Sequence, residues 1–91
     1  MIDFDNILLT APKIKEEIAL NFKRRRKENK VTQKQLAKET GVSLGSIKRF
    51  EQTGEISLSF LILLSQRLNL EKELYNLFTT PHYENIEDML K

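Results

Sequence analysis

The sequence predicts an all-α fold, with five helices in a single domain over residues 1–91. Apolar residues recur at intervals of three and four, as they do along one face of a helix. Serine or threonine precedes several of these stretches and glycine follows two of them, which is the usual order at helix ends. The alternation of β-branched and polar residues that is typical of strands is missing. A chain of this length suits one domain with a small core.

The first helix is predicted from about Pro12 to Glu28. Proline is favoured in a first helical turn because its missing N–H has no helical partner there. Ile14, Ile18 and Phe22 then follow at intervals of four, which indicates one apolar face.

The second helix is predicted to begin at Thr32. Thr32 and Gln35 fit a capping box, in which each side chain binds a free backbone N–H at the helix start. Leu36 and Ala37 face inward on this helix. Gly41 ends it by adopting a left-handed backbone conformation.

The third helix is predicted to begin at Ser43, a favourable N-cap residue, and to end at Gly54. At about 100° per residue, Ile47 and Phe50 define its buried side. The opposite side carries cations and an amide beside a residue without a side chain, with Leu44 at its edge: Gly45, Lys48, Arg49 and Gln52.

The fourth helix is predicted from Ser57 to about Asn69, and it is apolar nearly all round. One helical stripe consists of Leu58, Leu61, Leu64 and Leu68. Further apolar residues lie outside that stripe: Phe60, Ile62 and Leu63. A helix of this kind is buried on more than one side.

The fifth helix is predicted from about Glu71 to Phe78, and a last short helix is weakly indicated at residues 85–90. Leu74, Leu77 and Phe78 of the fifth helix can cover one side of the fourth. A second copy of the chain can cover another side, and we favour a mixture of the two. The alternative is that packing within one chain buries the whole surface.

Charge is segregated along the chain. Residues 13–50 carry a net charge of +8 and residues 51–91 a net charge of −4, although the whole chain has only +2. A block of +8 attracts a polyanion, whereas the other half repels one. The chain has no cysteine, its N-terminus resembles no signal peptide, and its longest apolar run is too short to span a bilayer, so we expect a cytoplasmic protein.

The second and third helices together form a predicted helix-turn-helix. Both are short, and the Gly41 turn holds them at a fixed angle, so that the second member of the pair can enter the major groove of DNA. Arginine can donate two hydrogen bonds to guanine, glutamine can pair with adenine, and leucine can pack on a thymine methyl group. Gly45 is consistent with a close backbone approach to DNA and equally with neutral drift.

The stretches "TQKQLAKETGVSLGSIKRFEQTG" and "ISLSFLILLSQRLNL" resemble the helix-turn-helix domain of the Cro/phage-repressor (XRE) family. The resemblance covers about residues 14–70. It implies a five-helix, lambda-repressor-like bundle that binds operator DNA in double-stranded form, usually as a homodimer. Residues 71–91 then form a short C-terminal segment for dimer or partner binding.

The resemblance also assigns roles to individual residues. Arg26 would pair with Glu51 and tie the first helix to the third. Lys30 stands where the family commonly has glycine, so Asn29 or Lys30 makes that turn at some strain. The implied DNA contacts are Thr32, Gln33, Lys34, Ser43, Leu44, Gly45, Ser46, Lys48, Arg49, Gln52 and Thr53.

A narrower resemblance links "SLGSIKRFEQTGEISL" and the tail "LFTTPHYENIEDMLK" to HipB-like antitoxins. Those proteins repress their own operon and hold a HipA-like kinase toxin on DNA. The alternative is a stand-alone XRE-type regulator with no toxin partner. The residues expected at a dimer or partner surface are Phe60, Leu63, Tyr75, Phe78, Tyr83, Ile86 and Leu90.

Other functions are less consistent with the sequence. His82 is the sole histidine, so we expect no metal site, and no motif for a cofactor or a catalytic nucleophile is present. We therefore do not expect an enzyme. RNA binding is the nearest alternative, but "KRRRKENK" has no interleaved aromatic residues for base stacking.

Overall fold

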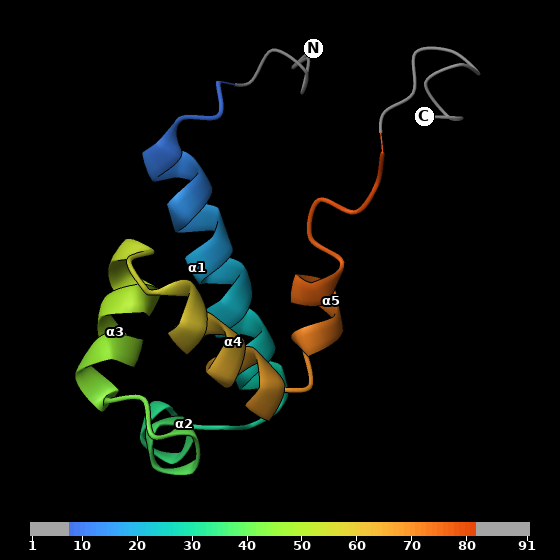
Figure 1. Ribbon diagram of the computed structural model, residues 1–91. Helices are drawn as coiled ribbons and strands as arrows, with labels where there is room; N and C mark the ends of the chain where they lie inside the picture. Colours follow the sequence, from blue (N-terminus) through green and yellow to red (C-terminus); the bar gives the residue numbers. More distant parts are fainter. Residues whose placement is uncertain (1–7, 82–91) are drawn as a thin grey trace.

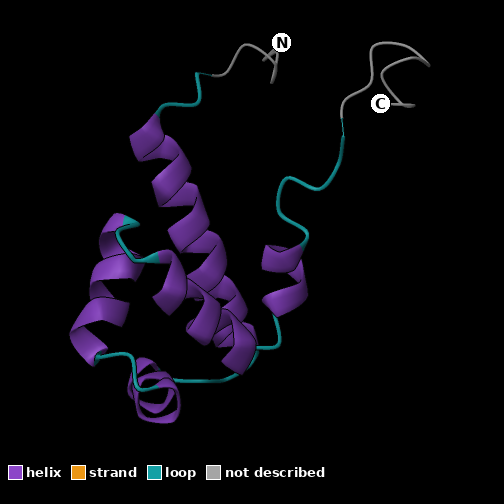
Figure 2. Ribbon diagram, viewed as in Figure 1, coloured by secondary structure: helices purple, strands orange, loops and turns teal. Residues whose placement is uncertain are grey.

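The computed structural model describes residues 8–81, which form five helices and, within that range, no strand (Figures 1 and 2). The predicted all-α fold is thereby confirmed. The predicted helix at residues 85–90 lies outside the described residues. The helices are α1 (Ala11–Glu28), α2 (Gln33–Thr40), α3 (Leu44–Thr53), α4 (Leu58–Arg67) and α5 (Glu71–Tyr75).

Side-chain caps fix the starts of three helices where the sequence predicted them. The hydroxyl of Thr32 accepts from the N–H of Gln35 at 3.0 Å, and Ser43 and Ser57 cap α3 and α4 in the same way. The side chain of Gln35 donates to Glu39 at 3.4 Å and is therefore directed along α2. The structure thus contains the Thr32 half of the predicted capping box.

Left-handed glycines end α2 and α3. Gly41 and Gly54 both have φ +79° and donate their N–H groups to carbonyl oxygens of the preceding helix. The turn after α1 is made by Lys30 at φ +57°, which confirms the expected strain at a non-glycine residue.

The core lies where α1 packs on α3 and where α2 packs on both α3 and α4. The rings of Phe22 and Phe50 meet edge to face, with centroids 5.2 Å apart. The side chains with the least exposure are Leu36, Val42, Ile47, Phe50, Leu64 and Leu68.

The sequence overestimated the extent of the core at both ends. Ile14 and Ile18, in the first half of α1, are exposed, and the first buried residue of α1 is Ala19 (Figure 1). Leu58, which was expected in the stripe of α4, is 64% exposed. It lies in the first turn of α4, at the rim of the bundle.

The fifth helix is shorter than predicted. It ends at Tyr75, since residues 76–78 form a turn in which Phe78 has φ +63°. Leu77 is exposed and Phe78 is 93% exposed, so neither residue covers α4 as expected. Phe60, Ile62 and Leu63 of α4 are exposed as well. Among the described residues, no helix combines the length and apolar character needed to cross a membrane.

Candidate nucleic-acid interface

A buried polar network holds the helix-turn-helix on α1. The guanidinium of Arg26 donates from Nε and Nη2 to the two carboxylate oxygens of Glu51, at 2.7 and 2.8 Å. Its Nη1 donates to the carbonyl oxygen of Val31 at 2.9 Å. The side chains of Arg26 and Glu51 are only 8% and 3% exposed. This bidentate geometry fixes orientation as well as distance, and it joins α1, the turn before α2, and α3.

Gln33 completes this network. Its amide nitrogen donates to the Glu51 carboxylate at 3.0 Å, so the first residue of α2 is bonded directly to α3. Each carboxylate oxygen of Glu51 thus has at least one donor, and no buried side-chain N or O atom in the described part of the chain lacks a partner. The angle between the two helices is therefore fixed by hydrogen bonds as well as by packing of Leu36 against the core.

One side of α3 is exposed at the surface of the bundle. Ile47, Phe50 and Glu51 are buried, whereas the candidate DNA-contacting side chains lie at the surface. Leu44 and Ser46 are partly buried, and the exposed members of the set are Gly45, Lys48, Arg49, Gln52 and Thr53. A Cβ atom added to Gly45 would meet no atom within 4 Å, so the fold itself does not require glycine there.

Hydroxyl groups gather at the start of α3. Ser43 accepts from the N–H of Ser46 at 3.1 Å and donates to the hydroxyl of Ser46 at 2.8 Å. The start of α2, with Thr32 and Lys34, is likewise exposed. Both helix starts therefore offer exposed hydrogen-bonding groups and the positive end of a helix dipole, which favour contact with phosphate groups.

In the described part of the chain, the cations of α2 and α3 take part in no salt bridge. In the described range, the salt bridges of α1 involve Lys13, Lys15, Arg24, Arg25 and Arg26. None of the salt bridges found there engages the cations of α2 and α3, which are Lys34, Lys38, Lys48 and Arg49. Positive charge on the helix-turn-helix is thus available to a polyanion.

Glu55 is a neighbour of this face that the sequence did not reveal. It shares a hollow of about 290 Å³ with Ser46, Arg49 and Phe60, between α3 and the start of α4. Helical periodicity could not place it, because Glu55 follows the Gly54 stop and its position depends on the loop.

The residues expected at a partner surface do not form one cluster. Tyr75 and Phe78 lie in an apolar groove between α4 and α5, whereas Phe60 lines the hollow beside Arg49. Leu63 is exposed but lines neither of these two depressions. The remaining three members of the set lie outside the described residues: Tyr83, Ile86 and Leu90.

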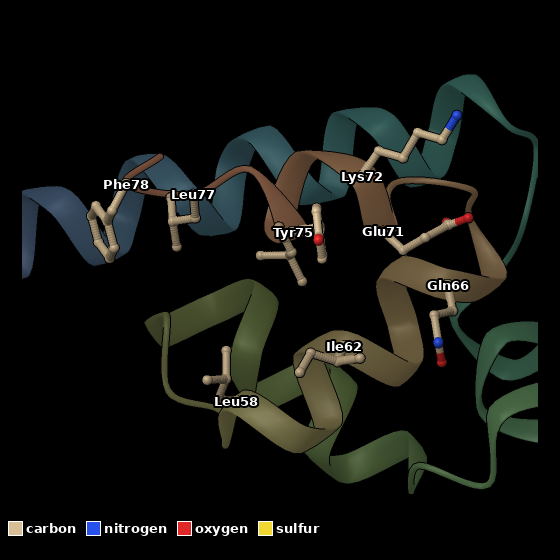
Figure 3. Close-up of a pocket in the computed structure, with 9 residues that line it drawn as sticks. Leu58, Ile62, Gln66, Glu71, Lys72, Tyr75, Leu77 and Phe78 are labelled. Atoms are coloured by element: carbon tan, nitrogen blue, oxygen red, sulfur yellow. The ribbon is translucent and has the colours of Figure 1, made fainter. Parts of the chain in front are cut away.

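The groove itself has a volume of about 660 Å³. Figure 3 shows Leu58 and Ile62 of α4 on one side of it, with Tyr75, Leu77 and Phe78 across from them. Its other lining residues are Gln66, Glu71, Lys72 and Leu74. Among the described residues, no group of His, Cys, Asp and Glu side chains is arranged to hold a metal ion.

Comparison with known proteins gives one match. A family model described as Helix-turn-helix matches residues 22–74, which is more than half of the chain and includes α2, α3 and α4 completely. No curated protein and no solved structure shows significant similarity to the sequence.

Proposed function

Because the chain belongs to the XRE-type helix-turn-helix family of DNA-binding regulators, we propose that it is a homodimeric repressor of one operator in double-stranded DNA. The observation that carries this proposal is the exposed side of α3, where Lys48, Arg49 and Gln52 lie on a helix that the Arg26–Glu51 pair fixes to α1. Rigid placement matters because base contacts require accurate geometry. Such a repressor acts in the cytoplasm, where its operator lies.

We assign reading and positioning to different residues. Arg49 reads guanine through two hydrogen bonds in the major groove, and Gln52 reads an adjacent base. Lys34, Thr32 and Ser43 bind phosphates and set the register of the protein on the duplex. Gln33 acts through Glu51 to hold α3 in place, since its amide is already engaged there. Gly45 lets the α3 backbone approach the DNA closely.

Replacement of Arg49 tests this division. We expect Arg49→Ala to cost about 1–3 kcal/mol of binding to the preferred duplex and to relax the preference at one base step, because a bidentate contact with guanine is lost. Lys34→Ala should weaken binding to all duplexes alike and reduce the salt dependence by the equivalent of one phosphate contact. Fluorescence anisotropy with preferred and scrambled duplexes measures both effects. If Arg49→Ala weakens binding to the preferred and the scrambled duplex equally, Arg49 contacts only a phosphate.

The groove between α4 and α5 supports a homodimer. Its most exposed apolar side chains are Tyr75 at 85% and Phe78 at 93%. Large aromatic side chains of this kind are the usual anchors of protein interfaces. The rim also carries Glu71 beside Lys72, so a copy related by a two-fold axis can pair opposite charges. We therefore place a second copy in this groove.

Phe78→Ser tests this dimer surface. We expect it to raise the dimer dissociation constant by about tenfold or more, because a side chain that is 93% exposed in one copy is the largest anchor available to the other. Leu20→Ser is the matched control, since Leu20 is also exposed but does not line the groove. Sedimentation velocity over a range of concentrations gives both constants. If the two substitutions have the same effect, the second copy binds elsewhere.

An antitoxin role stays a prediction. It rests on the resemblance of residues 43–58 and of the tail, and residues 82–91 of that tail lie outside the described range. The alternative is a stand-alone regulator. Co-purification with the product of a neighbouring kinase-like gene favours the antitoxin. The absence of such a gene next to this one favours the stand-alone regulator.

A further inference from the structure

The main chain after α3 turns back onto α1 and places Glu55 beside the exposed side of α3. The hydroxyl of Thr53 donates to the carbonyl oxygen of Arg49 at 2.7 Å and accepts from the N–H of Glu55 at 3.1 Å. The Glu55 carboxylate then accepts from Nζ of Lys15 at 2.5 Å. Glu55 is therefore held at both its backbone and its carboxylate.

Arg49 and Glu55 face the same hollow. Both residues line the space between α3 and the start of α4, together with Ser46, Ser57 and Phe60. The hydrogen bond from Lys15 holds the pKa of Glu55 below its ordinary value, and the charges of Lys15 and Arg49 lower it further against the opposing effect of partial burial. Glu55 thus presents a fixed negative charge next to a cation that we assign to base reading.

We propose that Glu55 is a positioning residue that suppresses non-specific DNA binding, by competing with phosphates for Arg49. This inference rests on the proposed function. Binding to random DNA is supplied by contacts between cations and phosphates. A resident carboxylate attracts Arg49 and repels an incoming phosphate, so it weakens those contacts.

The effect on the preferred duplex is smaller for a geometric reason. There Arg49 donates two hydrogen bonds to a guanine edge in the major groove and is not bound to a phosphate. Glu55 keeps its bond with Lys15 when Arg49 moves to the base, so its charge remains paired. Glu55 consequently lowers affinity for random DNA more than affinity for the preferred site, and it raises the ratio between the two.

The test uses Glu55→Gln, which removes the charge and keeps the size of the side chain. We expect its affinity for a random-sequence duplex to rise roughly three- to fivefold at low salt, with a salt slope steeper by about 0.9 for one additional phosphate contact. The affinity of Glu55→Gln for the duplex selected by the unmodified protein should change less than about twofold, as expected when a charge at the rim of an interface is removed. Glu55→Asp retains the charge and should restore most of the original ratio.

Glu73→Gln is the matched control. Glu73 is also an exposed carboxylate with an arginine partner, Arg25, but it lies on α5 and does not line the hollow of Arg49. If Glu73→Gln raises random-duplex affinity as much as Glu55→Gln, or if Glu55→Gln leaves that affinity and its salt slope unchanged, the proposal is wrong. If the unmodified protein prefers no duplex at all, the proposed function itself fails. Thermal unfolding of each variant verifies that α3 and α4 remain folded.

Discussion

Glu51→Gln is expected to destabilise the fold by about 3–5 kcal/mol, because it leaves the buried guanidinium of Arg26 without its counter-charge. The two side chains are 8% and 3% exposed, so water cannot replace the lost partner. Gln33 also loses a charged acceptor for its amide. For a domain of this size, total stability is on the order of 5–14 kcal/mol, and the loss is therefore a large share of it.

Urea unfolding of the Glu51→Gln and Glu73→Gln variants tests this expectation by comparing their losses of stability. Glu73 also forms an ion pair with an arginine, but its side chain is exposed, so its replacement should leave the unfolding midpoint nearly unchanged. The double replacement Arg26→Met with Glu51→Leu should recover much of the stability, since a buried pair often exchanges for apolar residues at little cost. Equal losses from Glu51→Gln and Glu73→Gln would contradict the buried network as the main link between α1 and α3.

Gly54→Ala is expected to cost about 3–4 kcal/mol and to lower the unfolding midpoint temperature by about 15 °C or more. Two effects combine at this position. Gly54 has φ +79°, which is unfavourable for alanine, and a Cβ atom there would lie 2.5 Å from Cβ of Lys15 and 2.8 Å from its carbonyl oxygen. The α1 backbone must move away from the end of α3 to admit the methyl group.

Gly41→Ala separates the two effects. Gly41 has the same φ, yet an added Cβ would meet no atom within 4 Å. It should therefore show only the conformational cost, about 1–2 kcal/mol. The difference between the two variants in the free energy of unfolding, measured by calorimetry, gives the cost of the close contact between α1 and the end of α3. A difference near zero would show that the α1 backbone moves away from the added methyl group without a measurable cost.

The helix boundaries were predictable because their signals are local. Thr32, Ser43 and Ser57 cap the helices that they precede, and Gly41 and Gly54 end helices in the conformation that glycine favours. Each signal depends on a few neighbouring residues and on backbone hydrogen bonds. The strained turn at Asn29 or Lys30 was instead implied by the family resemblance, and in the structure Lys30 has the positive φ.

Burial and the exact site were less predictable, because they depend on distant neighbours. Periodicity identified the apolar face of α1 but not that Ile14 and Ile18 on that face are exposed. It also extended the fifth helix to Phe78, where the chain instead forms a left-handed turn. Glu55 lies beside Arg49 because its loop contacts α1 through Lys15, and the spacing of residues in the sequence does not predict such a contact.

Selection of bound duplexes from a pool of random sequences tests the central claim, that the exposed side of α3 reads one operator. We predict enrichment of an inverted repeat with half-sites about one helical turn apart, bound with an affinity that falls steeply with salt. Selection with Arg49→Ala should lose the preference at one position in each half-site. Enrichment of no sequence, with equal affinity for every duplex, would contradict this account.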